Sequence, residues 1–275
     1  MRQLLIFLFC AVVSGAPPDV DWKNFTYPMV DSAVAREVRW MTTRAKQTVA
    51  LIDGRYVVPD DCADDIHQCP LITWTSVSHG TLTGVKPAVA AVALTWHTGG
   101  TQNWQYVYVF ALESSGPRLL AWLETGSRST YGLRAVSIAG GELILVVNDP
   151  DHAQGDCCSS GSITTRYRWN GSSFSVVGQP LHQIDPPSFD CAKAATPVER
   201  LICRDADLSY MDSTMADSYR NAINGASDER KQILRRQQAE WFADYRRACN
   251  APLSDELRFS CILQHLSDRM TTFLK

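Results

Sequence analysis

The sequence predicts an α+β protein of two domains, an N-terminal antiparallel β-sheet domain followed by a disulfide-stapled helical domain. From about Ala35 to Gly178, short β-branched and aromatic runs are separated by glycine pairs and turn residues, which is typical of strands. After Ser188, apolar residues recur three or four positions apart between helix start and stop signals. The predicted parts are a signal peptide at 1–16, a β-rich domain at 17–178, a Pro-rich linker at 179–187 and a helical domain at 188–275.

The N-terminus has the pattern of a secretory signal peptide. Arg2 precedes the apolar run Leu4 to Val13, and small residues follow, so we expect cleavage near Gly15 or Ala16. The run has about ten residues, whereas a membrane-spanning helix needs about twenty, so a membrane-spanning chain is not expected. Lipidation at Cys10 is not expected either, because a phenylalanine precedes it where a small residue is required. The expected location is the periplasm or the outside of the cell.

Eight cysteines remain after removal of the signal peptide, and an even number in an exported chain indicates disulfides. A zinc site is not expected, because the chain has no Cys-x-x-Cys and no histidine pair at helical spacing. Cys157 and Cys158 are adjacent, and a bond between neighbours would distort the peptide that joins them. We expect them to pair with Cys62 and Cys69. The competing pair is Cys62 with Cys69, and the order of pairing stays open.

The β-rich part contains three clear strands and two hairpins. The strands are expected at Val89–Trp96, Trp104–Phe110 and Leu119–Leu123. Gly140-Gly141 joins the runs of the first hairpin, Ala135–Ala139 and Glu142–Val147, and Asn170-Gly171 joins those of the second, Thr164–Trp169 and Phe174–Val177. Asn-Gly tolerates the positive φ angles of a tight type I′ turn. We therefore predict an antiparallel sheet folded on itself.

Three motifs stand out in this part, namely Gly155-Asp156-Cys157-Cys158, the Trp-Asn-Gly-Ser hairpin at Trp169, and the run from Leu82-Thr83-Gly84 to Ala91. Together they resemble the β-rich modules of secreted or lipid-anchored bacterial proteins of the LppP/LprE type. The resemblance covers about residues 75 to 178. Modules of that type often carry acidic residues around the Thr-Gly turn, where this chain has Val85-Lys86-Pro87-Ala88.

Two groups in the β-rich part could carry a function. His97, in Thr-Trp-His-Thr-Gly-Gly, could contact a partner, although a histidine in such a turn usually serves only as a hydrogen-bonding group. Asn148, Asp149, Asp151 and Asp156 form an oxygen-rich loop, but their spacing does not match the EF-hand calcium pattern. We interpret the loop as solvated, and expect no metal and no other cofactor.

The segment Gln179–Pro187 holds three prolines and no apolar period, so it is predicted to be the boundary between the two parts. Four helices follow. Thr196-Pro197-Val198-Glu199 is a capping box with proline at the first helical position. The remaining helices are expected to start at Asp205, Ser227 and Ser254, with stops at Asn224-Gly225 and Asn250-Ala251-Pro252.

The four cysteines of the helical part form two pairs with the same spacing of 12 positions. Local pairing, Cys191 with Cys203 and Cys249 with Cys261, would close the two corners of a helical hairpin. Closing a loop of about 13 residues stabilises a fold by about 3 kcal/mol through the loss of loop-closure entropy. This is a large contribution for a helical module of this size.

The helical part contains several motifs in a fixed order, namely Phe189 to Ala194, Thr196 to Cys203, Tyr219-Arg220, Gln238 to Trp241 with Arg246 and Cys249, and finally Cys261. With these motifs it resembles the LprI-type lysozyme-inhibitor domain, also called DUF1311, over about Ser188 to Lys275. The resemblance implies an exported bacterial envelope protein that inhibits lysozyme. It transfers no inhibitory residue, because the matching positions are cysteines, caps and core residues.

The expected activity is protein binding and not catalysis. The chain has no Gly-x-Ser-x-Gly, no His-Glu-x-x-His and no phosphate-binding glycine loop, so we assign no catalytic residue. The formal net charge is −3, and from Ser188 onward 13 basic residues balance 13 acidic ones, which argues against nucleic acid.

The leading hypothesis is an inhibitor of, or immunity protein against, a lysozyme or related peptidoglycan hydrolase. Such a partner is often cationic, so acidic residues of the second predicted helix could face it, namely Asp205, Asp207, Asp212 and Asp217. The alternatives are a solvated helix face or neutralisation by basic residues of the next helix, namely Arg230, Lys231, Arg235, Arg236, Arg246 and Arg247. The second hypothesis is a non-inhibitory envelope binding or scaffold module, whose site would include loops holding His97, Trp104 and Asp149.

Overall fold

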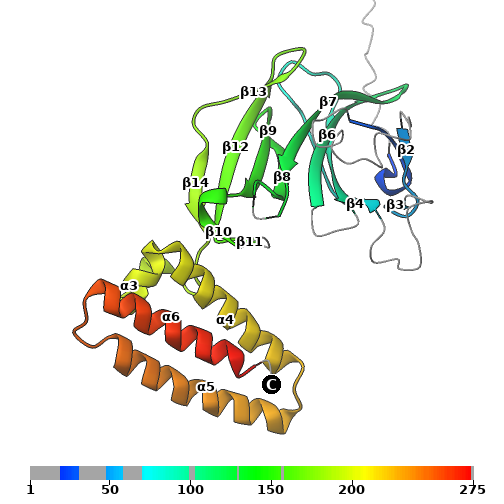
Figure 1. Ribbon diagram of the computed structural model, residues 1–275. Coiled ribbons are helices and arrows are strands. Elements are labelled where there is room, and N and C mark those ends of the chain that lie inside the picture. Colours follow the sequence, from blue (N-terminus) through cyan, green and yellow to red (C-terminus); the bar gives the residue numbers. More distant parts are fainter. Residues whose placement is uncertain are drawn as a thin grey trace, which may run out of the picture. The chain divides into compact units, whose positions relative to one another are not determined.

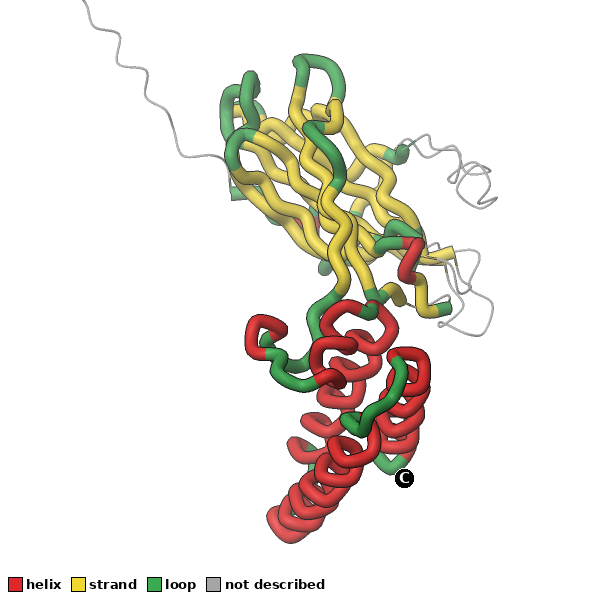
Figure 2. Tube along the Cα trace, turned by 90° about the vertical axis from the view of Figure 1, so that its left-hand side faces the viewer, coloured by secondary structure: helices red, strands yellow, loops and turns green. Residues whose placement is uncertain are grey.

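The computed structural model describes residues 19–30, 48–57, 70–98, 103–128, 130–155 and 158–273 (Figure 1). The predicted signal peptide, Cys10, Cys62, Cys69, Cys157 and Asp156 lie outside these residues. The predicted fold class is confirmed, because antiparallel sheets are followed by helices (Figure 2).

The described chain forms two compact units. The first comprises the described residues of Met1–Glu124, Val136–Ile144 and Arg166–Val177. The second comprises Thr125–Ala135, Leu145–Thr165 and Gly178–Lys275, so it holds the helices together with parts of several strands. The division therefore passes through the second large sheet, whereas the sequence predicted one boundary at the Pro-rich segment.

The first large sheet has the strand order β3-β4-β5-β6-β7. The strands span Arg55–Val57, Pro70–Gly80, Val89–Thr98, Asn103–Glu113 and Gly116–Gly126. The central strand β5 is buried on both faces, because every residue from Val89 to Leu94 is at most 1% exposed. A continuous apolar run is what a strand covered on both sides requires. This explains why the β5 sequence is apolar without alternation.

The segment before this sheet covers one of its faces. It contains the 3-10 helix η1 (Trp22–Asn24) and the two-stranded sheet of β1 (Thr26–Pro28) and β2 (Thr48–Ala50). Trp22 and Tyr27 belong to the same buried cluster as alternate residues of β5 and β6, including Trp96 and Tyr108. The Tyr108 hydroxyl donates a hydrogen bond to the Pro28 carbonyl at 3.1 Å, so a polar contact also holds this N-terminal segment against the sheet.

The second large sheet has the order β13-β12-β9-β8, with β14 also paired to β12. The strands are β8 (Leu133–Ala139), β9 (Glu142–Asn148), β12 (Gly161–Trp169), β13 (Phe174–Val176) and β14 (Leu181–Ile184). A 3-10 helix η3 (Pro150–His152) and the short pair β10 (Ala153–Gln154) and β11 (Cys158–Ser159) lie between β9 and β12. The structure thus contains separate sheets, whereas a single folded sheet was predicted.

The two hairpin turns differ from each other. Gly140 and Gly141 both have positive φ and form the whole connection between β8 and β9, as a tight turn requires. At the second hairpin, Trp169 pairs with Phe174, so the loop has four residues, and only Gly171 has positive φ. The predicted type I′ turn is wrong there, because the Asn170 side chain accepts hydrogen bonds from Ser172 and Ser173 N–H and holds a wider turn.

The Pro-rich segment is partly a strand. Leu181–Ile184 forms β14, and it pairs antiparallel with Gly161–Thr164 of β12. All four residues of β14 are exposed, which explains why the segment has no apolar period. The predicted Pro-rich linker therefore contains a strand that pairs with the second large sheet.

The helices begin and end close to the predicted signals. They are α3 (Pro197–Arg204), α4 (Ala206–Asn224), α5 (Asp228–Cys249) and α6 (Asp255–Thr271), preceded by the 3-10 helix η4 (Cys191–Lys193). Thr196, Asp205, Ser227 and Ser254 are the N-caps. Helix α6 packs against both α4 and α5, as Figure 1 shows. Within the described residues, none of the helices has the length and apolar character needed to cross a membrane.

The helical core consists of side chains from all four helices. Leu208, Ile262 and Leu266 have no exposed surface, and Val198, Leu201, Ile202, Met215, Tyr245 and Cys249 complete the buried cluster. Burying such a side chain fully stabilises a fold by about 1.5–3 kcal/mol. The apolar stripes of the sequence are therefore core positions.

The capping box at Thr196 should contribute measurably to stability. Thr196 Oγ1 accepts the Glu199 N–H at 3.2 Å, and Glu199 Oε2 accepts the Thr196 N–H at 2.9 Å. We expect Thr196→Ala to lower the free energy of unfolding by about 1 kcal/mol, measured by urea unfolding. Ser260→Ala, at an exposed position inside α6, is the control and should change it by less than about 0.5 kcal/mol. Equal effects would show that the cap contributes nothing specific.

Candidate functional site

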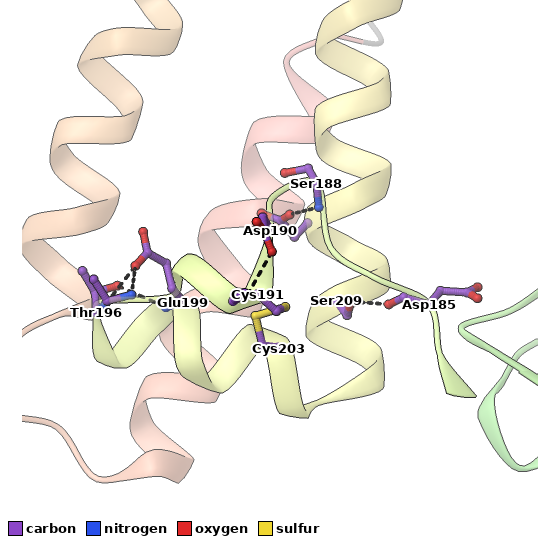
Figure 3. Close-up of a disulfide and its surroundings, with 11 residues drawn as sticks. Asp185, Ser188, Asp190, Cys191, Thr196, Glu199, Cys203 and Ser209 are labelled. Carbon is purple, nitrogen blue, oxygen red and sulfur yellow. Dashed lines mark hydrogen bonds between the residues drawn. A yellow bond between two sulfur atoms is a disulfide. The ribbon is translucent and has the colours of Figure 1, made fainter. Parts of the chain in front are cut away.

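Two disulfides link neighbouring elements of the helical part. Cys191–Cys203 joins η4 to α3, with a Cα separation of 5.8 Å (Figure 3). Cys249–Cys261 joins the end of α5 to α6, with a Cα separation of 5.7 Å. Both correspond to the pairing expected from the spacing. Cys158 is also disulfide-bonded, while the expectations for Cys62, Cys69 and Cys157 concern residues outside the described part.

The chain before α3 is held against α4 by side chains shown in Figure 3. Ser209, which is fully buried, donates its hydroxyl to the Asp185 carbonyl at 2.5 Å. The Ser188 N–H donates to the Asp212 carboxylate at 2.7 Å. Asp190 accepts the Ala192 N–H and caps η4. These contacts position the first disulfide beside α4.

The aspartates of α4 do not form an acidic face. Positions 205, 207 and 217 point in different directions, because successive residues of an α-helix are about 100° apart. Asp205 accepts the N–H groups of Asp207 and Leu208 as the N-cap. Asp207 accepts a hydrogen bond from Gln154 at 2.5 Å, and Asp217 pairs with Arg220. All three carboxylates therefore have contacts within this chain, and they do not converge on one partner.

Asp212, which lies between Asp207 and Asp217 on α4, is 8% exposed and lies on the core side of the helix. Burial raises the pKa of its carboxyl above the ordinary value, and the hydrogen bond from Ser188 opposes this only in part. Among the described residues, no lysine, arginine or histidine forms an ion pair with it. Asp212 is therefore a buried acid that cannot face a partner.

This burial predicts a pH dependence of stability. Since the pKa of Asp212 is raised in the folded state, its contribution to stability is present below the unfolded pKa of about 3.9 and is lost as pH rises through the folded pKa. In Asp212→Asn this loss should be absent, so the variant's free energy of unfolding, relative to the wild type, should rise with pH above about 4. Urea unfolding at a series of pH values measures it. A constant difference between the two proteins would contradict the prediction.

His97 is held inside the first sheet. Its Nε2 lies 3.1 Å from Thr73 Oγ1 and its Nδ1 lies 2.8 Å from Asn103 Oδ1. Trp104, which the second hypothesis placed in an exposed loop, lies in β6 and packs against the buried cluster of that sheet. Both residues therefore have structural roles that account for their presence.

Two members of the predicted oxygen-rich loop, Asn148 and Asp149, have side-chain oxygens that accept hydrogen bonds within the protein. Asp149 is 1% exposed, accepts the Asp151 N–H at the start of η3, and hydrogen-bonds His182 Nδ1 at 2.7 Å. Asn148 accepts from Arg134 Nε at 2.5 Å. These side-chain oxygens accept hydrogen bonds from the start of η3 and from neighbouring side chains. The second hypothesis required Asp149 to lie in an exposed loop, but its side chain is buried.

One group in the helical part brings three potential metal ligands within 4.8 Å of one another, namely Cys249, Cys261 and His265. The two sulfurs form a disulfide with each other. A disulfide sulfur is not a thiolate, and zinc binds cysteine as the thiolate. In the oxidised protein this group therefore offers only the histidine.

The surface that the sequence analysis missed lies on α5. Of its 22 residues, only Leu234, Tyr245 and Cys249 are buried. Arg235, Ala239, Phe242 and Arg246 are exposed and spaced by four, three and four positions, so they lie in one stripe, which we call the arginine stripe. The spacing is visible in the sequence, but the arginines were interpreted there as counter-charges for α4.

Comparison of the chain with protein-family models, curated proteins and solved structures finds no match. The functional assignment therefore depends on the motifs of the chain and on the chemistry of its surfaces.

Proposed function

We propose that the protein is an exported inhibitor of, or immunity protein against, a lysozyme or related peptidoglycan hydrolase, and that it acts by binding the enzyme. Support comes from the ordered motifs of the LprI-like part, which become caps and disulfides of a small helical unit. The single observation that carries the proposal is the pair of disulfides, Cys191–Cys203 and Cys249–Cys261, which link neighbouring elements of this unit. Disulfides of this kind suit a domain that works in an oxidising compartment.

A rigid helical scaffold fits an inhibitor because preorganisation lowers the entropy lost on binding. An inhibitor needs no catalytic side chains, because it only has to bind the enzyme and block access of the substrate. The alternative of a non-inhibitory envelope scaffold has less support, because its proposed site residues His97 and Asp149 are engaged within the chain.

A lysis assay tests the proposal. Peptidoglycan suspensions are cleared by c-type, g-type and bacterial lysozymes, and the oxidised protein is titrated into each reaction while turbidity is followed. We expect at least one enzyme to be inhibited at a roughly stoichiometric concentration, and the inhibition to disappear after reduction. No inhibition of any enzyme at large excess would refute the proposed function.

A further inference from the structure

We propose that the arginine stripe of α5 is the surface that contacts the hydrolase, and that the stripe fits an acidic substrate cleft. This inference rests on the proposed function and names the surface and the partner chemistry for it. Arg235 and Arg246 are 11 positions apart, which corresponds to about 16 Å along the helix. Phe242 lies between them and is 38% exposed.

The stripe combines charge with an aromatic anchor. Arg246 lies over the Phe242 ring, 4.4 Å from its centroid, so the two side chains hold each other in place before any partner binds. Arginine and aromatic residues are the types that most often dominate binding energy at protein interfaces. Ala239 adds a small side chain between the arginines, which lets a partner surface approach the helix closely.

The charge of the stripe is available for a partner. From Arg235 to Arg246 the stripe contains no acidic residue, because Glu240 and Asp244 lie on other sides of α5. Asp228, seven positions before Arg235 on the same side, is paired with Lys231. Neither Arg235 nor Arg246 forms an ion pair with any carboxylate that the structure describes, although Arg246 contributes to lowering the pKa of Glu199. On the neighbouring stripe, by contrast, Arg247 is paired with Asp244.

The complementary partner surface is one that carries carboxylates. Glycoside hydrolases generally place two carboxylic residues across the scissile bond, one protonated and one ionised, so at least one negative charge lies at the centre of the cleft. Two arginines about 16 Å apart, with an aromatic ring between them, can span such a cleft and exclude substrate from it. In this arrangement the inhibitor surface is positive and the enzyme surface is negative. The hypothesis from the sequence had the opposite signs, with acidic residues of α4 facing a cationic enzyme.

Matched charge reversals test the assignment in the same lysis assay and in direct binding to the inhibited enzyme. Arg235→Glu with Arg246→Glu should weaken inhibition on the order of 100-fold, and Phe242→Ala about tenfold. Arg236→Glu with Arg247→Glu on the neighbouring stripe changes the net charge equally and should weaken it less than about threefold. Far-UV circular dichroism checks that each variant is folded.

The outcomes separate the surface from the function. Loss of inhibition in the first double variant but not in the second supports the arginine stripe. If the wild-type protein inhibits and both double variants inhibit equally well, the stripe is not the surface and the proposed function stands. If the wild-type protein inhibits no enzyme, the proposed function and the stripe assignment fall together.

Discussion

Replacing Cys249 and Cys261 together by alanine should lower the free energy of unfolding of the helical part by about 3 kcal/mol or more. The disulfide closes a loop of 12 positions, and the lost loop-closure entropy accounts for about 3 kcal/mol. Cys249 has no exposed surface and belongs to the helical core, so its removal also loses packing. Urea unfolding followed by far-UV circular dichroism, which reports the helices, measures the change.

The matched variant replaces Cys191 and Cys203, which close a loop of the same length. Cys191 is exposed and outside the helical core, so this pair should lose the entropic contribution without the packing contribution. We therefore expect the free energy of unfolding to fall less in this variant than in the variant that lacks Cys249 and Cys261. The opposite order, or no loss in either variant, would mean that loop closure does not govern the stability of the helices.

Replacing Arg134 by lysine should destabilise the second unit by about 2 kcal/mol. The guanidinium donates to Asn148 Oδ1 and Asp185 Oδ1 at 2.5 Å, and to the Ser159 and Gly161 carbonyls at 2.7 and 2.8 Å. Its side chain is 27% exposed, so these bonds are partly shielded from water. A lysine ammonium cannot reproduce the planar fork that reaches four acceptors. Each unsatisfied partner then costs part of its desolvation energy.

Arg118→Lys provides the control for this variant. Arg118 pairs with Glu113 at 2.6 Å, but its side chain is 56% exposed, and exposed ion pairs contribute less than about 1 kcal/mol. Thermal unfolding of the two lysine variants should therefore separate them clearly. If both lose the same stability, the network around Arg134 is no stronger than a surface pair.

Local signals predicted the helical part well. The caps at Thr196, Asp205, Ser227 and Ser254 act between residues two or three positions apart, so the chemistry that starts each helix is present in the local sequence. The equal cysteine spacing is a local signal of the same kind. Neither depends on how distant parts of the chain come together.

The errors arose where distant contacts or side-chain bonding decided the outcome. Strand β14 has an exposed, Pro-flanked sequence, and only its pairing with β12 makes it a strand. The turn at Asn170 was mistaken because its side chain bonds to the backbone. The α4 aspartates looked equivalent in the sequence, yet Asp212 is buried and Asp207 is bound by Gln154, 53 positions away. Burial and such contacts cannot be read from residue type.

The hydrogen bonds around Asp185 determine how the helices can be isolated for study. The Asp185 carbonyl is the acceptor for the buried Ser209 hydroxyl, and its N–H donates to the Ser160 carbonyl at 2.9 Å. A fragment beginning at Ser188, where the helical domain was predicted to start, would leave the Ser209 hydroxyl inside α4 without its acceptor. The helical fragment should therefore begin at or before Asp185. If a shorter fragment fails to fold, the loss of the Ser209 hydrogen bond explains the failure, and the result says nothing about the activity of the helical part.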